Sequence, residues 1–106
     1  KDHVIRMLGD QMRPYIIEAD VECQPLQVIF DRNRVDGIDL IHVDTEGFDY
    51  QVLSQVDFKR YKPSVILFEH HLLTDDEFFK ARKLLRGSGY RLLQYGNDTL
   101  AVRRSL

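Results

Sequence analysis

The sequence has a single cysteine, no long apolar run and no large excess of charge of either sign. One cysteine, Cys23, excludes an intrachain disulfide framework and favours a reducing compartment. No stretch approaches the roughly 20 apolar residues that a transmembrane helix needs, and the first residues do not resemble a secretory signal. The 15 basic and 17 acidic side chains are interspersed, which argues against a nucleic-acid surface. We therefore expect a cytoplasmic protein with neither a membrane nor a nucleic-acid partner.

The beginning of the chain also lacks an initiator methionine and a glycine-rich loop. The length of 106 residues is enough for one small domain. No internal repeat, low-complexity tract or linker divides it. Residues 1–106 are therefore expected to form a single domain.

Helical and strand patterns alternate along the chain. Thr74 and Glu77 form a capping box, which predicts the start of a helix, and the polar turn at residues 96–98 predicts a hairpin. Alternation of this kind is typical of a parallel sheet with helices on its faces. The expected helices cover residues 4–9, 26–34, 48–56 and 74–86, and the expected strands cover residues 15–23, 38–43, 64–68, 90–95 and 99–103.

Two of the apolar strands stop on chemically reactive side chains. Ligands in open α/β sheets bind outside the carboxyl ends of the strands. We therefore expect one site built from both strand ends. Its candidate residues are Asp44, Glu46 and Gly47 after the first of these strands, and Glu69 and His70 after the second.

Residues 38–53, with the sequence IDLIHVDTEGFDYQVL, resemble the DLLKIDVEG signature of FkbM-type S-adenosylmethionine-dependent methyltransferases. Residues 61–70 resemble the next strand of that family, and residues 89–92 resemble the entry to its closing hairpin. The resemblance implies an α/β fold with a partial Rossmann-like sheet, mostly parallel with an antiparallel closing hairpin and helices on both faces. It also implies S-adenosyl-L-methionine as the cofactor, and O-methylation of a glycan or a small hydroxylated metabolite.

The resemblance also shows what this chain does not contain. Family members bind the cofactor mainly through a glycine-rich loop after the first strand and an acid at the end of the second. Here the only early glycine is Gly9, and no buried strand precedes it. The resemblance therefore implies the carboxyl-terminal half of the domain, inactive on its own. Without the first strands, residues 38–43 would have an open edge, so we expect a homodimer that pairs through it, unless residues 15–23 fold over that edge.

The resemblance implies roles for the candidate residues. Asp44 and Glu46 would be catalytic, with Asp44 also contacting the cofactor, and Gly47, Glu69 and His70 would contact substrate or shape the turn. Asp44, Glu69 and His70 also offer ligands for a divalent metal, as in methyltransferases of the catechol type. In purely structural roles, Asp44 and Glu46 would lie at the N-terminus of the next helix, and Glu69 would pair with a base.

Two functions outside the methyltransferases remain open. Residues 36–44 also resemble the phospho-acceptor strand of a response-regulator receiver, although the acidic pair and the lysine of that family are missing. Phosphorylation of Asp44 by a small phosphodonor would favour this interpretation. The other alternative is a non-catalytic α/β interaction module.

Overall fold

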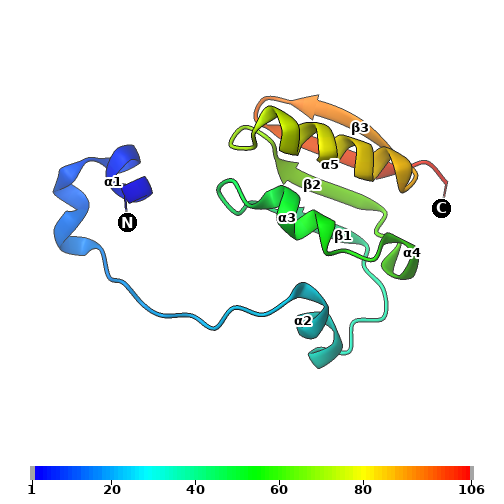
Figure 1. Ribbon diagram of the computed structural model, residues 1–106, viewed down its shortest axis with the longest axis horizontal. Coiled ribbons are helices and arrows are strands. Elements are labelled where there is room, and N and C mark those ends of the chain that lie inside the picture. The colour runs from blue at the N-terminus through cyan, green and yellow to red at the C-terminus, as the bar shows by residue number, and fades with distance from the viewer. Residues whose placement is uncertain (1, 106) are drawn as a thin grey trace.

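The computed structural model describes residues 2–105, in which four strands form one mixed sheet. The strand order is β1-β2-β4-β3, with β1 parallel to β2 and β4 antiparallel to both β2 and β3 (Figure 1). β1, β2 and β3 therefore run in one direction and β4 runs in the other, which is consistent with the expected sheet, mostly parallel with an antiparallel closing hairpin. The strands are β1 (Leu40–Val43), β2 (Val65–Glu69), β3 (Tyr90–Tyr95) and β4 (Asp98–Arg103).

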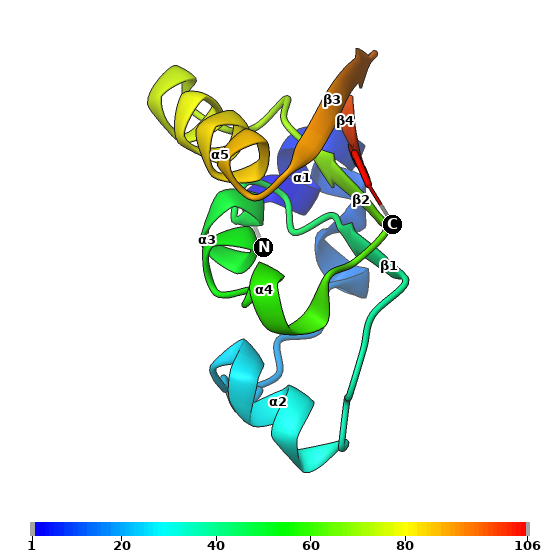
Figure 2. The same ribbon diagram turned by 90° about the vertical axis from the view of Figure 1, so that its right-hand side faces the viewer.

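Four of the helices fall close to the ranges expected from the sequence, whereas the short helices at residues 10–15 and 58–61 were not expected. The three that follow β1, named α3, α4 and α5, lie on one side of the sheet (Figure 2). None of the helices within residues 2–105 has the length and apolar character to cross a membrane. The helices are α1 (Asp2–Leu8), the 3-10 helix η1 (Asp10–Tyr15), α2 (Leu26–Arg32), α3 (Asp49–Ser54), α4 (Phe58–Tyr61) and α5 (Asp75–Gly87).

The core lies between the sheet and helices α3 and α5. Ile66 and Phe68 of β2 are fully buried there, together with Leu53 of α3 and Leu85 of α5. Each such side chain stabilises the fold by about 1.5–3 kcal/mol through removal of its apolar surface from water. The buried hydroxyl of Tyr90 donates a 2.6 Å hydrogen bond to the carbonyl of Pro63, so its polar atom is also satisfied. This core fixes the carboxyl ends of β1 and β2 next to each other.

The opposite face of the sheet stays largely uncovered in the described part of the chain. Leu40, Leu93 and Val102 point to that face, and 58%, 64% and 39% of their surfaces are exposed. The expectation of helices on both faces is therefore wrong here. The chain between β1 and β2, and between β2 and β3, passes over the same side of the sheet, so all three of its helices pack there.

Residues 15–23 do not form the expected strand. Tyr15 ends η1, and residues 16–23 are extended without strand pairing, with Ile17 91% and Val21 84% exposed. A strand needs a neighbour to accept and donate its backbone hydrogen bonds, and this segment lies apart from the sheet (Figure 1). The radius of gyration is accordingly 16.0 Å, against about 13 Å for a compact chain of this length.

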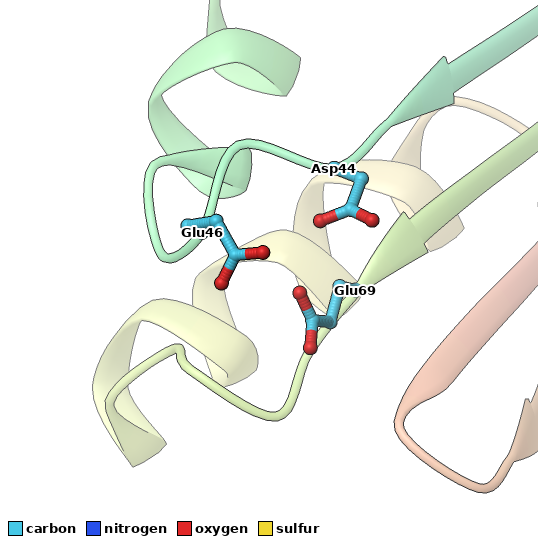
Figure 3. Close-up of side chains that lie close together, drawn as sticks. All are labelled: Asp44, Glu46 and Glu69. Carbon is cyan, nitrogen blue, oxygen red and sulfur yellow. The ribbon is translucent and has the colours of Figure 1, made fainter. Parts of the chain in front are cut away.

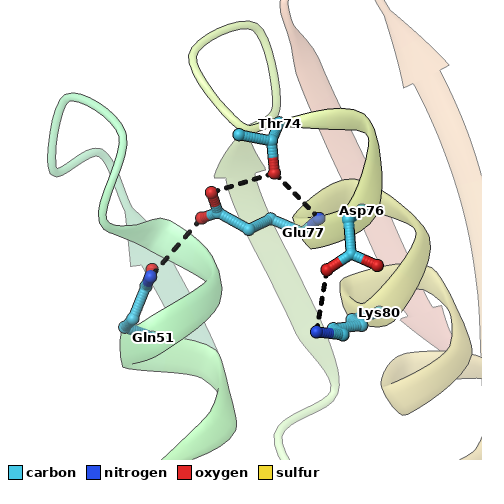
Figure 4. A network of polar contacts seen from close by, with 5 residues as sticks. All are labelled: Gln51, Thr74, Asp76, Glu77 and Lys80. Carbon is cyan, nitrogen blue, oxygen red and sulfur yellow. Dashed lines mark hydrogen bonds and ion pairs between the residues drawn. The ribbon is translucent and has the colours of Figure 1, made fainter.

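The start of α5 carries the expected cap (Figure 4). The Thr74 hydroxyl oxygen accepts a 3.1 Å hydrogen bond from the Glu77 backbone N–H, and this hydroxyl donates to the Glu77 carboxylate at 3.0 Å. Gln51 of α3 donates to the same carboxylate at 3.4 Å. Lys80 pairs with Asp76 at 2.8 Å, one turn apart. The cap therefore also ties α5 to α3, the helix that follows β1.

Candidate acidic site

Three carboxylates gather at the carboxyl ends of β1 and β2. Asp44 directly follows β1, Glu46 lies in the next loop, and Glu69 ends β2. One oxygen from each lies within 4.8 Å of the others, and their side chains face a common point (Figure 3). Asp44 and Glu46 are exposed and Glu69 is half-buried, so the cluster opens to solvent.

The loop after β1 uses two successive left-handed residues. Glu46 has φ 55° and Gly47 has φ 107°. The Glu46 conformation costs about 1–2 kcal/mol relative to right-handed backbone, whereas glycine adopts such angles freely. A Cβ at residue 47 would meet Leu72 atoms only at 3.6 Å, so backbone angle rather than space requires glycine here. The turn directs the Glu46 side chain back toward Asp44 and Glu69.

A fourth carboxylate, that of Asp49, lies beneath the cluster and is completely buried. Its Oδ1 accepts hydrogen bonds from the Thr45 backbone N–H at 2.9 Å and from the Thr45 hydroxyl at 2.5 Å. Its Oδ2 accepts from the Glu69 backbone N–H at 2.9 Å. Asp49 therefore joins the loop after β1 to the end of β2. The sequence analysis assigns no role to Asp49. The signal that could have identified it is an acidic residue in the first turn of the helix that follows a site loop.

The pKa of Glu69 is raised above its ordinary value of 4.5. Partial burial is the largest cause, followed by a hydrogen bond with Asp44 and by repulsion from Asp44, Glu46 and Asp49. A hydrogen bond between two carboxyl groups requires that one of them hold a proton. The cluster therefore favours either a shared proton or a positively charged ligand.

The carboxylates of the cluster do not adopt the structural roles that the sequence left open. Phe48 occupies the N-cap position of α3 without a side-chain cap, so neither Asp44 nor Glu46 caps that helix. Glu46 instead lies 3.2 Å from His3 Nε2 of α1. Glu69 has no basic partner among residues 2–105, where its interactions are with other acids. Asp44 and Glu69 are thus available to a ligand, whereas Glu46 also contacts His3.

His70 is not among the side chains that gather at the cluster. Its Nδ1 is 2.9 Å from the Thr99 hydroxyl, and its ring stacks on Phe78 with 4.7 Å between centroids. The guanidinium of Arg82 also lies over the Phe78 ring, at 4.3 Å from its centroid. The potential ligand set is therefore Asp44, Glu46 and Glu69, in place of the expected Asp44, Glu69 and His70.

The chemistry of this site is that of an open acidic cluster. Carboxylate oxygens are ligands for hard cations such as Mg²⁺ and Ca²⁺, and they favour an organic cation equally well by charge. A carboxylate with a raised pKa is also a suitable general base near neutral pH. The geometry thus offers a place for a cation and a group that can accept a proton.

Comparison with known protein families gives the class of this protein. The model of the methyltransferase FkbM domain matches residues 5–92, which include both site strands. The chain therefore belongs to the FkbM methyltransferase family. Searches of curated proteins and of solved structures found no significant match. The family match favours a methyltransferase over the receiver interpretation of residues 36–44.

We predict that Asp49→Asn destabilises the protein by about 2–4 kcal/mol, because one accepting oxygen becomes a donor that faces another donor. Urea denaturation measures the free energy of unfolding. Thr45→Val, which removes only the hydroxyl contact, is the matched control and should cost about 1 kcal/mol. Equal stability of Asp49→Asn and the wild type would contradict the anchoring role.

We predict that Glu69→Gln is more stable than the wild type at neutral pH, by less than about 1 kcal/mol because water screens a partly exposed charge. The pKa of Glu69 is raised in the folded state. The contribution of Glu69 to the free energy of unfolding is therefore fully present below pH 4.5 and is lost as the pH rises through the folded-state pKa. The advantage of the variant should therefore disappear as the pH falls below 4.5. Urea denaturation across this range tests it, with the exposed Asp36→Asn as control. A stability advantage of Glu69→Gln that grows as the pH falls would contradict this prediction.

Proposed function

We propose that this chain is the carboxyl-terminal half of an S-adenosylmethionine-dependent O-methyltransferase domain. The observation that carries the proposal is the convergence of Asp44, Glu46 and Glu69 within 4.8 Å at the carboxyl edge of the sheet. In open α/β folds, this edge is where ligands bind. Membership of the FkbM methyltransferase family supports the reaction class.

The donor chemistry of the site fits the charged part of this cofactor. S-adenosylmethionine carries a positive sulfonium, which supplies an electrophilic methyl group when the cofactor is bound. Asp44 and Glu46 lie exposed beside each other, and their charges would hold a cation against the end of β1. The remaining cofactor contacts, a glycine-rich loop and an acid that binds the ribose, have no counterpart in residues 2–105. They would come from the amino-terminal half of the domain.

Glu69 is the residue best suited to move a proton. Its raised pKa makes it a stronger base than an ordinary carboxylate. The bound cofactor would supply the methyl group, whose bond to sulfur would break as a bond to the acceptor oxygen forms, with the thioether as leaving group. Glu69 would accept the proton of the acceptor hydroxyl. Asp49 holds the backbone of Glu69 and so positions its carboxylate toward Asp44. The proposed acceptors are a glycan or a small hydroxylated metabolite, the classes that the family resemblance implies.

A divalent metal is a second use of the same carboxylates. Asp44, Glu46 and Glu69 would supply three oxygen ligands, and a metal there would lower the pKa of a bound acceptor hydroxyl. His70 is not needed in this arrangement, since its Nδ1 contacts Thr99. Binding of S-adenosylmethionine measured in the presence of a chelator shows whether the carboxylates hold the cofactor without a metal ion.

We predict that Asp44→Asn weakens binding of S-adenosylmethionine by about tenfold, the effect of losing roughly 1.4 kcal/mol of charge attraction. Binding of S-adenosylhomocysteine, which has no sulfonium charge, should change less than about twofold because attraction to a cation is what the variant loses. NMR titration to millimolar ligand, with chelator present, measures both. Asp36→Asn removes an exposed acid outside the cluster and is the control.

The sulfonium contact would be refuted by equal weakening of both ligands in Asp44→Asn. Restoration of binding by Mg²⁺ after removal of the chelator would favour the metal arrangement.

A second candidate function is self-association through the edge of β1. Within residues 2–105, β1 pairs only with β2, so its other edge has no strand beside it. A cavity of about 380 Å³ adjoins this edge, lined mainly by apolar side chains that include Leu26, Phe30 and Leu40. Open apolar edges recruit strands from other chains. We propose a homodimer that pairs through β1.

We predict that Leu40→Lys shifts the protein toward monomer, because a lysine on an edge strand opposes pairing. Sedimentation equilibrium measures the change, and the expected loss of dimer affinity is at least about tenfold. Leu93→Lys, on the other edge strand and similarly exposed, is the matched control. A wild-type chain that stays monomeric at high concentration would contradict pairing through β1.

A further inference from the structure

A second, basic site lies at the other end of the sheet. A cavity of about 580 Å³ is bounded by α4, by the end of α5 and by the end of β4. Figure 1 shows α4 at the side of the sheet opposite the loop after β1 and the end of β2. The Arg103 backbone N–H bonds to the carbonyl of Ser64, just before β2, which fixes this cavity at the amino end of that strand. The cavity is thus separate from the Asp44, Glu46 and Glu69 cluster.

All the charged side chains that line this cavity are basic. Lys59 and Lys62 come from α4 and its C-cap, Arg103 ends β4, and no acidic residue is among the lining side chains. None of these three cations forms an ion pair with an acid in the described residues, whereas Arg60 pairs with Asp31. The excess of positive charge in the cavity is therefore not compensated by an ion pair within residues 2–105.

Arg103 shows a second sign of an incomplete site. Its Nε is buried, yet it has no hydrogen-bond partner within residues 2–105. Its backbone lies opposite Tyr90, whose hydroxyl is occupied by the carbonyl of Pro63. Buried polar groups in folded proteins are normally hydrogen-bonded, so an unpaired guanidinium donor calls for an acceptor. An anion in the cavity would supply one.

Neighbouring groups do not satisfy these cations. Asp57, the acid at the N-cap of α4, uses its Oδ1 to accept from the backbone N–H groups of Lys59 and Arg60. At the end of α5, Ser88 donates its N–H and its hydroxyl to the carbonyl of Leu84. The Asp57 Oδ1 and the Leu84 carbonyl are therefore engaged, and among the described residues no ion pair joins Asp57 to the three cations of the cavity.

Basic residues around the cavity strengthen its attraction for anions. Two adjacent cavities around the end of α5 are also lined by basic residues without acids, one by Arg82, Lys83 and Arg86 and one by Arg86, Arg91 and Arg104. A cluster of like charges raises the local concentration of counter-ions. Three cations in one cavity match a phosphate monoester, with its charge of about −2 near neutral pH, better than a carboxylate.

From these observations we propose that the cavity between α4, α5 and β4 binds a phosphate group of a small molecule through Lys59, Lys62 and Arg103. Arg103 would present its planar fork of donors to the phosphate oxygens, and the lysines would act as point charges. The cavity volume lies within the roughly 300–1,000 Å³ typical of small-molecule sites.

The test measures binding of inorganic phosphate to the full chain by ³¹P NMR at constant ionic strength. The Lys59→Gln/Lys62→Gln double variant, at two exposed positions, should bind about tenfold more weakly. Arg103→Lys keeps the charge but loses the fork, and it should also bind about tenfold more weakly. Circular dichroism confirms that each variant is folded. The matched control is Arg91→Gln/Arg104→Gln, which removes two charges from a neighbouring cavity and should weaken binding less than about twofold.

Three results would overturn the proposal. The first is the absence of saturable phosphate binding by the wild type. The second is equal weakening in the test and control double variants, which indicates general charge attraction. The third is binding to phosphatidylcholine vesicles that contain phosphatidic acid without binding to free phosphate, because that outcome assigns the basic residues to a lipid surface.

Discussion

Asp49 accepts hydrogen bonds from the loop after β1 and from the end of β2, and it does so with no exposed surface. The cost of burying a carboxylate is high unless several donors surround it. Here Thr45 supplies two donors and Glu69 one, so the buried oxygen atoms are satisfied. The acidic cluster depends on this arrangement, because the same contacts fix the backbone from which Asp44 and Glu69 project.

The remaining features of the site follow from that anchor. With the loop held at Thr45, the chain reaches α3 within a few residues, and the left-handed backbone of Glu46 and Gly47 makes this turn. Strained backbone of this kind persists where the surrounding structure determines it and is concentrated at functional sites. The core beneath, with Phe68 and Leu53, keeps the two strand ends in register. Site geometry and core packing are therefore parts of one structure.

Features with local signals could be predicted from the sequence. Thr74 and Glu77 predict the start of α5, and the polar turn before Asp98 predicts the hairpin. Caps and turns can be predicted because they depend on residues that are neighbours in the chain. The extended residues 16–23 could not be predicted, since alternation alone does not provide a pairing partner. The membership of Asp44 and Glu69 in one site followed from the strand pattern, because parallel strands end at the same edge.

Which side chains gather at the acidic cluster depends on the direction in which each side chain points. Successive residues of a strand point to opposite faces, so His70 points toward α5 as Phe68 does, while Glu69 points toward Asp44. Glu46 joined the cluster through a backbone turn that has no clear signal in the residue itself. Asp49 was missed because its partners, Thr45 and the Glu69 amide, are brought together only by tertiary structure.

The sheet also separates its charges. The carboxylates lie at one end of β2 and the cationic cavity at the other, with five residues of strand between them. That strand spans roughly 16 Å, which exceeds the Debye length of about 8 Å at physiological ionic strength. Each end is therefore electrostatically independent in salt, so a ligand at one end would leave the charge balance of the other unchanged. In dilute buffer of about 0.01 M the Debye length of about 30 Å exceeds this separation, so the charges at both ends act together on an approaching charged molecule.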